Sequence, residues 1–509
     1  MNIFLDQLKM IKIEGQQLML VQELLEQGNA ETIALIDGDK RITYRQLQLQ
    51  VEKYRNYFHS CGIRSGENVG LLSRNSVEYI YIYMAIASLG AVVVPINFQL
   101  SDREIAYIVK DADMNFLIAN QTVTLGQVLV KQGYDKKLTL LQVLNIVDAI
   151  SSQSYYNCPS LPDSFSAQET CVIIYTSGTT GSPKGAELSH HNLVSDAAMF
   201  QEALSINDKD NVLCVLPMYH CFAWTCAVLN PLFSGATITI LDTFAPKETT
   251  EVIKAEKVSV VYAVPPICSL LTRSATPADL ATVRIIVVGG TTLPLKIAEN
   301  FTAKFGVELL EGYGLSEASP VVAVNRPGKV KAGSIGLALP QIIACIVNEE
   351  GEELPSGEVG ELVVWGDNVM KGYFHLPEET EQALAGGWLH TGDMAYQDEE
   401  GYIFIVDRLK DMIISNGENI YPREIEELLY AYPDIMEATV VGINDKLRGQ
   451  AGAAFIVMEA GKELGKKELK EYLQANLALY KIPREFHVVD SLPKSQTGKI
   501  LKRVLVESV

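Results

Sequence analysis

Short apolar runs alternate with amphipathic stretches along most of the first 330 residues. The β-branched runs at 115–120, 171–176, 211–217, 236–241, 258–265 and 283–290 predict strands. The stretches 246–257 and 293–306 repeat their apolar residues at helical spacing and predict helices. Because the strand-like runs are continuously apolar and separated by helices, they indicate parallel sheets with both faces covered. The pattern therefore predicts an α/β fold.

The pattern changes after about residue 330. Residues 344–366 alternate short apolar strands with glycine-containing turns, which is typical of a small antiparallel barrel or sheet. Residues 401–433 predict a strand, a turn and then a helix, whose start is marked by Pro422 and by acids in its first turn. The last hundred residues therefore form a separate, small α+β unit.

One segment resembles a membrane span. Residues 79–96 carry no charge over 18 positions, close to the lower limit for a spanning helix. Gly90 and Pro95 interrupt it, and its second half is rich in valine. A buried helix followed by a buried strand fits these residues better, so no transmembrane segment is expected.

Composition and net charge argue against several classes of protein. A chain of 509 residues is long enough for two to four domains, and its net charge of −20 argues against a nucleic-acid-binding protein. The eight cysteines show neither Cys-x-x-Cys pairs nor zinc-ligand spacing, which indicates free thiols in a reducing compartment. The first residues lack the charged and apolar regions of a secretory leader, so a cytoplasmic location is expected.

A run of small residues, TSGTTGS, follows the apolar strand at 171–176 directly. Bare amides and hydroxyls beside a lysine suit a phosphate, and phosphates in α/β folds bind at the carboxyl ends of strands. The common phosphate loop has glycine immediately before its lysine, whereas Pro183 precedes Lys184 here. The stretch therefore belongs to another kind of nucleotide site.

The stretch EGYGLSE at 311–317 offers four groups suited to a nucleotide. Tyr313 supplies an aromatic face, Gly314 allows close approach, Ser316 supplies a hydroxyl and Glu317 a carboxylate. The stretch GGWLHTGD ends at Asp393, an acid able to accept hydrogen bonds from a ribose.

Two cationic stretches follow. VDRLKD contains Arg408 and Lys410, and PKSQTGKI places Lys499 near the C-terminus. Each stretch taken alone also fits an ordinary turn or a solvated loop. Together, in this order and at these separations, they are specific.

From about residue 30 to its end the chain resembles the adenylate-forming superfamily of acyl-CoA synthetases, adenylation domains and beetle luciferases, and most closely the bacterial fatty acyl-CoA ligases. The resemblance implies a large N-terminal domain at 1–407, built of two doubly wound sheets plus a small β-barrel. It also implies a hinge at 408–410 and a small, mobile α+β lid domain at 411–509.

The resemblance assigns roles to matching positions. Lys499, Glu317, Lys184 and His220 would be catalytic, Lys410 would be the hinge, and Thr176 and Glu317 would bind Mg²⁺. His220, Trp224, Gly289 and Thr291 would line the acyl pocket, and Asn416, Gly417 and Asn419 the coenzyme A channel. ATP would be held by Thr176, Ser177, Gly178, Thr179, Thr180, Gly181, Lys184, Gly290, Glu311, Gly312, Tyr313, Ser316, Asp393, Arg408 and Lys499. Relatives usually have threonine at 316; serine keeps the hydroxyl, so a small effect is expected.

The implied reaction needs ATP, Mg²⁺ and coenzyme A. The carboxylate attacks the α-phosphorus of ATP to give an acyl-adenylate and pyrophosphate, and a thiol then displaces AMP. Both the attacking and the leaving group are anionic, so catalysis is mainly positioning and charge neutralisation. This agrees with the absence of a nucleophile-and-base signature in the sequence.

The stretch 216–236 bears most on the acid. His220 would border the acyl site, although a core histidine capping a turn fits equally well. Trp224 resembles the tryptophan that gates the alkyl tunnel of some long-chain ligases, and the alternative is a packed core tryptophan. Apolar and small neighbours favour a medium- or long-chain fatty acid, while an aryl acid stays open. An amino acid is disfavoured because VYAVPPI, at 261–267, offers no carboxylate for an ammonium.

Three classes of protein fit the whole chain: a fatty acyl-CoA ligase, a stand-alone ligase that loads a carrier protein, and a non-catalytic relative. Coenzyme A is the favoured acceptor, and a carrier protein loaded by a stand-alone ligase is the alternative. Many aryl ligases have lysine where this chain has Asn416, which weakens the aryl reading. A non-catalytic relative would be free to lose Lys184, Glu317, Asp393 and Lys499, all of which are present along with Arg408. A homodimer is compatible with the sequence.

Overall fold

Two mostly parallel sheets form the body of the protein. The computed structural model describes residues 19–152, 158–176, 183–415, 418–445, 448–494 and 499–508. The larger sheet has nine strands, and its six central strands run parallel. Their order is β15 (Leu337–Ala338), β14 (Val321–Val324), β13 (Leu309–Gly314), β12 (Ile285–Val288), β11 (Val260–Ala263), β9 (Asn211–Cys214), β10 (Thr237–Ile240), β1 (Ile33–Asp37) and β2 (Lys40–Thr43).

The second sheet has seven strands. Their order is β18 (Gly372–Tyr373), β8 (Lys184–Ser189), β7 (Thr170–Thr176), β4 (Val92–Pro95), β3 (Asn68–Leu72), β5 (Phe116–Ala119) and β6 (Thr139–Gln142). β7, β4, β3, β5 and β6 are parallel, whereas β8 and β18 are antiparallel to their neighbours. The strands predicted from the apolar runs are thus confirmed, as is the α/β class.

The glycine-rich stretch joins β7 to β8 as an antiparallel hairpin, in which Thr176 pairs with Lys184. A common phosphate loop leads instead into a helix, whose N-terminal amides and dipole attract the phosphate. Here the next described element is a strand instead, since β8 starts at Lys184 itself. The Lys184 side chain supplies positive charge at the start of this strand.

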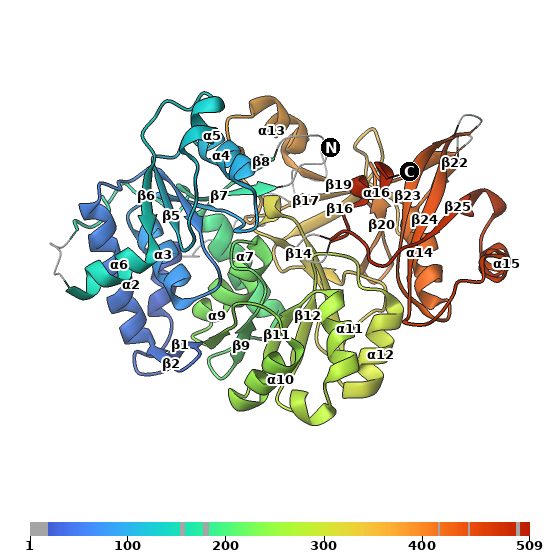
Figure 1. Cartoon of the computed structure of the whole chain (residues 1–509), viewed down its shortest axis with the longest axis horizontal. Coiled ribbons are helices and arrows are strands. Elements are labelled where there is room, and N and C mark those ends of the chain that lie inside the picture. The colour runs from blue at the N-terminus through green and yellow to red at the C-terminus, as the bar shows by residue number, and fades with distance from the viewer. Residues whose placement is uncertain are drawn as a thin grey trace.

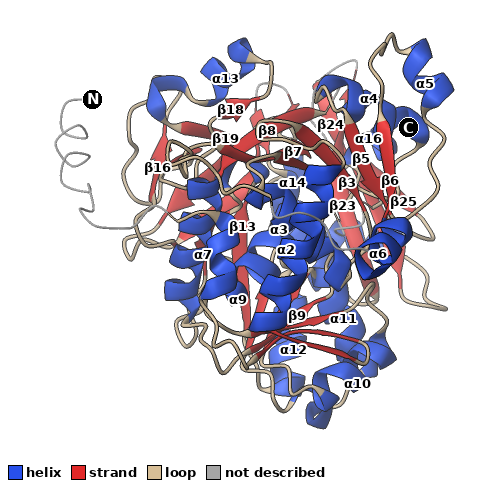
Figure 2. Cartoon of the chain, turned by 90° about the vertical axis from the view of Figure 1, so that its left-hand side faces the viewer, coloured by secondary structure: helices blue, strands red, loops and turns tan. Residues whose placement is uncertain are grey.

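Helices cover both sheets and fill the space between them. Helix α3 (Val77–Ser88) is apolar on every side because it lies wholly inside the body, with ten of its side chains buried. Figure 2 shows α2 (Tyr44–Ser60) and α3 in the middle of the molecule, among strands. The segment that resembled a membrane span is α3 followed by β4, as predicted, and none of the described helices is long and apolar enough to cross a membrane.

The remaining body helices follow their strands. They are α4 (Asp102–Asp111), α5 (Gly126–Lys131), α6 (Val143–Ser152), α7 (His190–Leu204), α8 (Cys221–Trp224), α9 (Asn230–Phe233), α10 (Pro246–Ala255), α11 (Pro265–Ser274), α12 (Leu295–Phe305) and α13 (Pro377–Ala383). A π-helical turn, Thr225–Leu229, connects α8 to α9. Such turns are rare and often lie at functional sites.

Two smaller β units follow along the chain. The first is a four-stranded antiparallel sheet in the order β16 (Ile343–Val347), β17 (Gly360–Trp365), β19 (Leu389–Gln397) and β20 (Ile403–Arg408). The second contains β22 (Glu418–Ile420), β21 (Ile413–Ser415), β24 (Gly449–Met458) and β23 (Ile435–Asp445), and β25 (Glu485–Val488) pairs with β24. Helices α14 (Pro422–Ala431), α15 (Lys466–Asn476) and α16 (Lys502–Val506) accompany this second sheet.

The C-terminal unit has its own hydrophobic core and lies at one end of the long axis, shown orange to red in Figure 1. Its helix α14 reaches the body, where the Glu427 carboxylate accepts a hydrogen bond from the Leu295 amide at 3.4 Å. The Arg423 amide donates to the Asp407 carboxylate at 3.0 Å. The C-terminal unit thus contacts the start of α12 and strand β20 of the four-stranded sheet.

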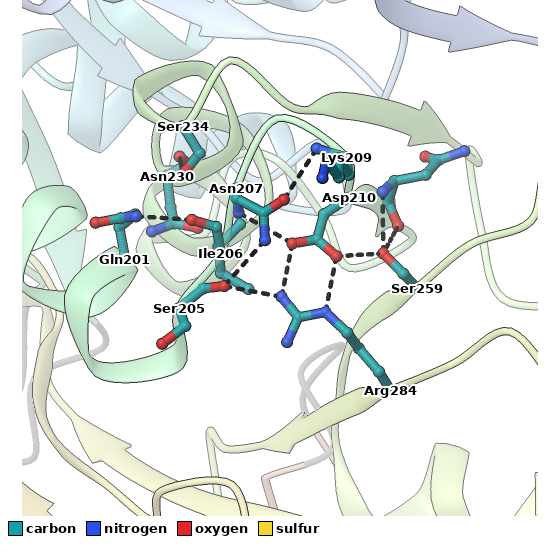
Figure 3. Close-up of polar contacts among 11 residues, drawn as sticks. Gln201, Ser205, Ile206, Asn207, Lys209, Asp210, Asn230, Ser234, Ser259 and Arg284 are labelled. Atoms are coloured by element: carbon teal, nitrogen blue, oxygen red, sulfur yellow. Dashed lines mark hydrogen bonds and ion pairs between the residues drawn. The ribbon is translucent and has the colours of Figure 1, made fainter.

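A buried ion pair joins the starts of three strands of the larger sheet (Figure 3). The Arg284 guanidinium binds both carboxylate oxygens of Asp210, at 2.8 and 2.6 Å, and the Ser259 hydroxyl donates to the same carboxylate at 2.7 Å. Burial alone would raise the pKa of Asp210, but the hydrogen bonds from Arg284 and Ser259 outweigh it and the pKa is lowered. This end of the sheet is opposite the carboxyl ends of the strands, so its role is stability.

Replacing Arg284 with alanine is expected to lower the free energy of unfolding by about 2–3 kcal/mol, because Asp210 would stay buried without its cation. The estimate lies below that for a fully buried pair because 39% of the Arg284 side chain is exposed, against 4% of Asp210. Since the pKa of Asp210 is lowered in the fold, the stabilisation is present at neutral pH and is lost as the pH falls through the folded-state value. Denaturant unfolding at pH 7 and below pH 4 measures this. Arg45→Ala, at an exposed pair with Glu31, is the control and should cost less than about 1 kcal/mol.

All eight cysteines are free, and seven of them are buried. Buried free cysteines behave as small apolar side chains. The structure therefore agrees with the reading of the cysteines as scattered core residues.

Candidate active site

A tyrosine lies between the lysine of the hairpin and the acid of the EGYGLSE stretch. The Lys184 ammonium lies 5.2 Å from the centre of the Tyr373 ring, and the Tyr373 hydroxyl donates to Oε1 of Glu317 at 2.8 Å. Thr176 is at the end of β7, where its hydroxyl contacts the Lys184 carbonyl oxygen at 3.5 Å. The structure thus brings Thr176, Lys184 and Glu317 to one corner, where a phosphate group would meet a cation and a carboxylate.

A second corner gathers the ring and the acid expected to hold a nucleoside. The Tyr313 hydroxyl donates to Oδ2 of Asp393, and the Nε of Arg408 lies 3.0 Å from Oδ1 of the same carboxylate. Asp393 and Arg408 face each other across β19 and β20. Only 2% of Asp393 is exposed, so its charge is shared between two fixed partners. Burial and the neighbouring Asp393 charge raise the pKa of Tyr313, which stays a neutral donor.

His220 is the N-cap of α8. Its Nδ1 accepts a hydrogen bond from the Phe222 amide at 3.2 Å. Burial and the positive charge of Lys499 lower the pKa of His220 to about 4, so the imidazole is neutral at physiological pH. Because Nδ1 accepts, the ring proton is on Nε2, which makes His220 a hydrogen-bond donor.

Phe222 and Gly289 define the apolar side of the site. A Cβ on Gly289 would lie 3.2 Å from the Phe222 ring, so the glycine lets that ring approach the end of β12. Tyr262 of β11 meets the same ring edge-on at 6.0 Å. Next to them, Gly290 adopts a positive φ of 79° and Thr291 is partly exposed.

Ser316 borders a buried thiol. The Cys221 sulfur lies 3.3 Å from the Ser316 hydroxyl oxygen and 3.9 Å from Nδ1 of His220. Burial raises the pKa of Cys221 to about 12, so the group is a neutral thiol. The Thr225 hydroxyl also donates to the Ser319 carbonyl at 2.7 Å. Helix α8 and the turn after it are therefore tied to the EGYGLSE segment at two points.

Lys499 reaches the site from the C-terminal unit. Burial of its ammonium and the positive charges of Arg408 and Lys410 lower the pKa of Lys499 to about 8. Lys499 is an exposed residue. A bound anion would offset the repulsion from Arg408 and Lys410, which is one of the two causes of the lowered pKa. The positive charge of Lys499 in turn helps to lower the pKa of His220. Lys410 is exposed directly after β20, and burial of its ammonium together with Arg408 lowers its pKa.

Glu311 and Gly312 lie on β13, beside the end of β12. The Glu311 carboxylate is 5% exposed and accepts a hydrogen bond from the Leu293 amide at 3.0 Å. Burial raises the pKa of Glu311 to about 7. Glu311 therefore holds the loop after Thr291 in place from behind, and its carboxylate is turned toward the protein.

Trp224 is 3% exposed and packs on α3, with its ring 3.9 Å from that of Tyr83 and 5.6 Å from that of Tyr79. Its indole Nε1 is buried, and the Trp224 side chain interacts with the Tyr83 hydroxyl. A buried tryptophan N–H usually has a partner. Tyr83 is that partner here, so the ring is held against α3.

Several predicted residues lie outside the part of the chain that the structure describes: Ser177, Gly178, Thr179, Thr180, Gly181, Asn416 and Gly417. Asn419 is described, exposed on β22, and no hydrogen bond among the described residues joins it to the site.

Sequence reasoning missed Tyr373, Cys221 and Asn368. The Asn368 amide donates to the carbonyl oxygens of Ala318 and Val321, at 2.7 and 2.9 Å, and so fixes the loop after Glu317. A signal for two of them was present in the stretch DNVMKGY at 367–373, where polar residues interrupt an apolar run. Cys221 gave no such signal, because its neighbours are apolar.

Comparison with protein families decides the kinship. The AMP-binding enzyme family matches residues 23–374, and the AMP-binding enzyme C-terminal domain matches residues 424–499. The chain belongs to the AMP-binding enzyme family. The adenylate-forming resemblance inferred from the motifs is thereby confirmed.

Similar proteins within this family are CoA ligases. A feruloyl-CoA synthase of Amycolatopsis sp is 35% identical over 92% of this chain and 94% of its own length. A long-chain-fatty-acid–CoA ligase of Bacillus subtilis (strain 168) is 33% identical over 92% of this chain and 90% of its own. The o-succinylbenzoate coenzyme A synthetase of Bacillus subtilis, solved with ATP and a magnesium ion, aligns with a TM-score of 0.84 and 29% identity over 96% of this chain and 99% of that one. The chain is accordingly an enzyme of the AMP-forming acid–CoA ligase class, and these relatives differ in the acid.

Proposed function

We propose that this enzyme activates an apolar carboxylic acid with ATP and transfers the acyl group to coenzyme A. In the first half-reaction a carboxylate oxygen attacks the α-phosphorus, and the bond to the bridging oxygen breaks to release pyrophosphate. In the second the coenzyme A thiol attacks the acyl carbonyl and AMP leaves with the former carboxylate oxygen.

One observation carries this proposal: the charge of Lys499, from the C-terminal unit, acts on His220 of the body, and the charges of Asp393 and Arg408 act on Lys499. A carboxylate approaching a triphosphate meets strong repulsion, and a lysine placed between the two anions reduces it. His220, with its proton on Nε2, is suited to orient the acid. Asp393, already bound by Tyr313 and Arg408, is suited to accept the ribose hydroxyls.

The donor set fits a magnesium ion carried with ATP. No cluster of three metal-ligating side chains occurs among the described residues, but Mg²⁺ is usually bound by one or two carboxylates together with substrate phosphates. Glu317 is partly exposed, and Tyr373 occupies only one of its oxygens. Glu317 and the Thr176 hydroxyl would hold the ion, which would neutralise phosphate charge.

We further propose that the chain hinges at 408–410, dividing a body at 1–407 from a lid at 411–509. The body core includes Ile405, whereas the core of the C-terminal unit begins at Ile413. Rotation there would withdraw Lys499 and bring the segment around Asn419 toward the thiol. Asn416 and Gly417 would complete the coenzyme A channel.

A medium- or long-chain fatty acid is the proposed substrate. The helical segment from α8 to α9 is uncharged and almost wholly buried, with a π turn directly after Trp224. The Trp224 ring packs on the Tyr79 and Tyr83 rings of α3. Displacement of Trp224 would open the space along α3 to an alkyl chain. The long-chain-fatty-acid–CoA ligase relative agrees with this reading.

An aryl acid is the second candidate. Phe222 and Tyr262 form an edge-on aromatic pair beside Gly289, a geometry that accepts a flat ring. The feruloyl-CoA synthase relative agrees with this alternative.

The deciding experiment measures pyrophosphate release with ATP and Mg²⁺ over hexanoate, dodecanoate, palmitate, benzoate, 4-coumarate and ferulate, each with and without coenzyme A. A rate that peaks with an alkyl acid and rises with coenzyme A supports the proposal. A peak with an aryl acid overturns the substrate and keeps the mechanism. Adenylation that coenzyme A leaves unchanged would point to a carrier protein, and no release with any acid would refute the proposed activity.

The preferred chain length of the acid tests the role of Trp224. If Trp224 closes the alkyl path, Trp224→Ala should shift the preferred acid to a longer chain, because the indole no longer occupies the space. Trp388→Ala, which alters an indole on the small antiparallel sheet, is the control. An unchanged chain-length profile in Trp224→Ala would mean that the indole is a core residue only.

Cys221 and Ser316 are expected to behave as a matched pair in adenylation. Serine at 316 lacks the methyl group that makes threonine stiff, and the Cys221 sulfur limits where the hydroxyl can turn. Cys221→Ala should lower the adenylation rate about threefold to tenfold, by analogy with the loss of one modest hydrogen bond. Adding Ser316→Thr should restore most of it, measured by pyrophosphate exchange. Independent, multiplicative effects would show that the two residues are not coupled.

A further inference from the structure

Tyr373 contacts two proposed site residues through two different parts of its side chain. Its hydroxyl donates to Glu317 at 2.8 Å, and its ring lies 5.2 Å below the Lys184 ammonium. Neither Lys184 nor Glu317 is near Tyr373 in sequence. The tyrosine is thus a direct bridge between the glycine-rich hairpin and the EGYGLSE segment.

The backbone around Tyr373 binds the same two segments. The Met370 amide donates to the Glu317 carbonyl at 2.8 Å, and the Phe374 amide donates to the Gly185 carbonyl at 2.8 Å. Strand β18 pairs Tyr373 with Ala186 of β8. Residues 370–374 therefore hold the hairpin and the acid together, and the position of Tyr373 is fixed by main-chain bonds.

The chemistry of the phenol suits this position. A phenol is neutral at physiological pH, so the Tyr373 hydroxyl acts as a neutral donor toward Glu317. A neutral donor fixes one carboxylate oxygen and leaves the charge and the second oxygen for another ligand. The ring face attracts the lysine ammonium without neutralising it. Each contact orients a charged group while leaving its charge available.

We propose that Tyr373 is a positioning residue that sets Lys184 for the triphosphate with its ring and Glu317 for the accompanying metal with its hydroxyl. The inference rests on the proposed function and adds to it a residue that links the two charge-neutralising groups. The two contacts are separable, because Tyr373→Phe removes only the hydroxyl and Tyr373→Leu removes both.

The test is ATP binding to the whole chain by calorimetry without any acid, so that no turnover occurs, first in EDTA and then with Mg²⁺. Tyr373→Phe should bind metal-free ATP like the wild type, but Mg²⁺ should tighten its binding about threefold to tenfold less, since a hydrogen bond to a charged group is lost. Tyr373→Leu should in addition weaken metal-free binding about twofold to fivefold, as expected for loss of a partly exposed cation–π contact.

Tyr402 provides a matched control. Its ring lies 5.0 Å from the Lys331 ammonium, and its hydroxyl donates to the Lys329 carbonyl at 2.9 Å. Tyr402 directly precedes β20, and its lysine neighbour forms an ion pair with Asp398 rather than with a proposed site residue. Tyr402→Phe and Tyr402→Leu should leave both ATP affinities unchanged. Thermal unfolding of all four variants checks folding, and the Phe variant decides if Tyr373→Leu fails to fold.

The outcomes are distinct. Loss of the magnesium effect in Tyr373→Phe with intact metal-free binding supports the inference. Equal weakening with and without Mg²⁺ in both variants, or no change in either, overturns it. Failure of the wild-type chain to bind ATP at all would overturn the proposed function instead.

Discussion

Lys499→Ala is expected to lower the rate of adenylate formation by about 100-fold to 1000-fold, the usual effect of removing one group that stabilises transition-state charge. The reason is the electrostatic interaction of Lys499 with His220 and with the Asp393–Arg408 pair, where the acid and the α-phosphate would meet. Pyrophosphate exchange with the preferred acid measures this step. Thioester formation from a supplied acyl-adenylate and coenzyme A should stay within about threefold of the wild-type rate, since the first half-reaction is bypassed.

Lys462 is a control lysine in the same unit, away from the proposed site. Lys462 forms an ion pair with Asp434 in the same unit, at 3.0 Å and half exposed, so Lys462→Ala should leave both half-reactions unchanged. Equal loss of both half-reactions in Lys499→Ala would contradict a role confined to adenylation. It would also remove the reason to propose that the C-terminal unit rotates between the two steps.

The pH dependence follows from the same lysine. With a pKa of about 8 in the free enzyme, Lys499 is protonated below that value and loses its charge as the pH rises through it. kcat/KM for adenylation, which reports the free enzyme, should therefore fall above about pH 8. Bound phosphates raise the pKa of a nearby lysine, so kcat should fall at a higher pH than kcat/KM. Lys499→Arg should flatten the alkaline fall in whatever activity it keeps, because arginine stays charged.

Much of the fold could be predicted from local patterns. Continuous β-branched runs became the central parallel strands, and the uncharged segment at 79–96 became α3 and β4. These features depend on burial on all sides, which a single sequence displays directly. The antiparallel hairpin of β7 and β8 was not foreseen, because nothing in the residues after the glycine-rich loop distinguishes a strand from the start of a helix.

Some residues of the site could likewise be predicted from the sequence, and others could not. Tyr313, Ser316, Glu317, Asp393 and Arg408 lie in short stretches of polar residues with a shared order, so the sequence could single them out. Residues that act through another side chain carry no such mark. Cys221 is recognisable only by its 3.3 Å contact with Ser316, because nearness between distant segments is a property of the folded chain. For Trp224 the sequence left two readings open, and its packing against Tyr79 and Tyr83 is compatible with both.

Gly314→Ala is expected to reduce adenylation by about 100-fold, because a small displacement of groups that must align with the reacting atoms has an effect of that size. A Cβ on Gly314 would lie 1.9 Å from the Pro320 carbonyl oxygen, far inside contact distance, and that oxygen accepts a hydrogen bond from the Leu315 amide at 2.9 Å. The collision is between backbone atoms, so no rotamer change relieves it. The strand that carries Tyr313 must move away from Pro320, and Glu317 moves with it.

Stability and activity should respond differently to this substitution. Overpacking of this kind typically costs about 1–3 kcal/mol of unfolding free energy, so Gly314→Ala should remain folded at room temperature. Gly126 has open space around it and an ordinary φ, and Gly126→Ala should leave both quantities unchanged. Denaturant unfolding and pyrophosphate exchange on the two variants provide the comparison. A folded Gly314→Ala protein with full adenylation activity would mean that the segment from Tyr313 to Glu317 does not position the reacting groups, and the site proposed here would have to be placed elsewhere.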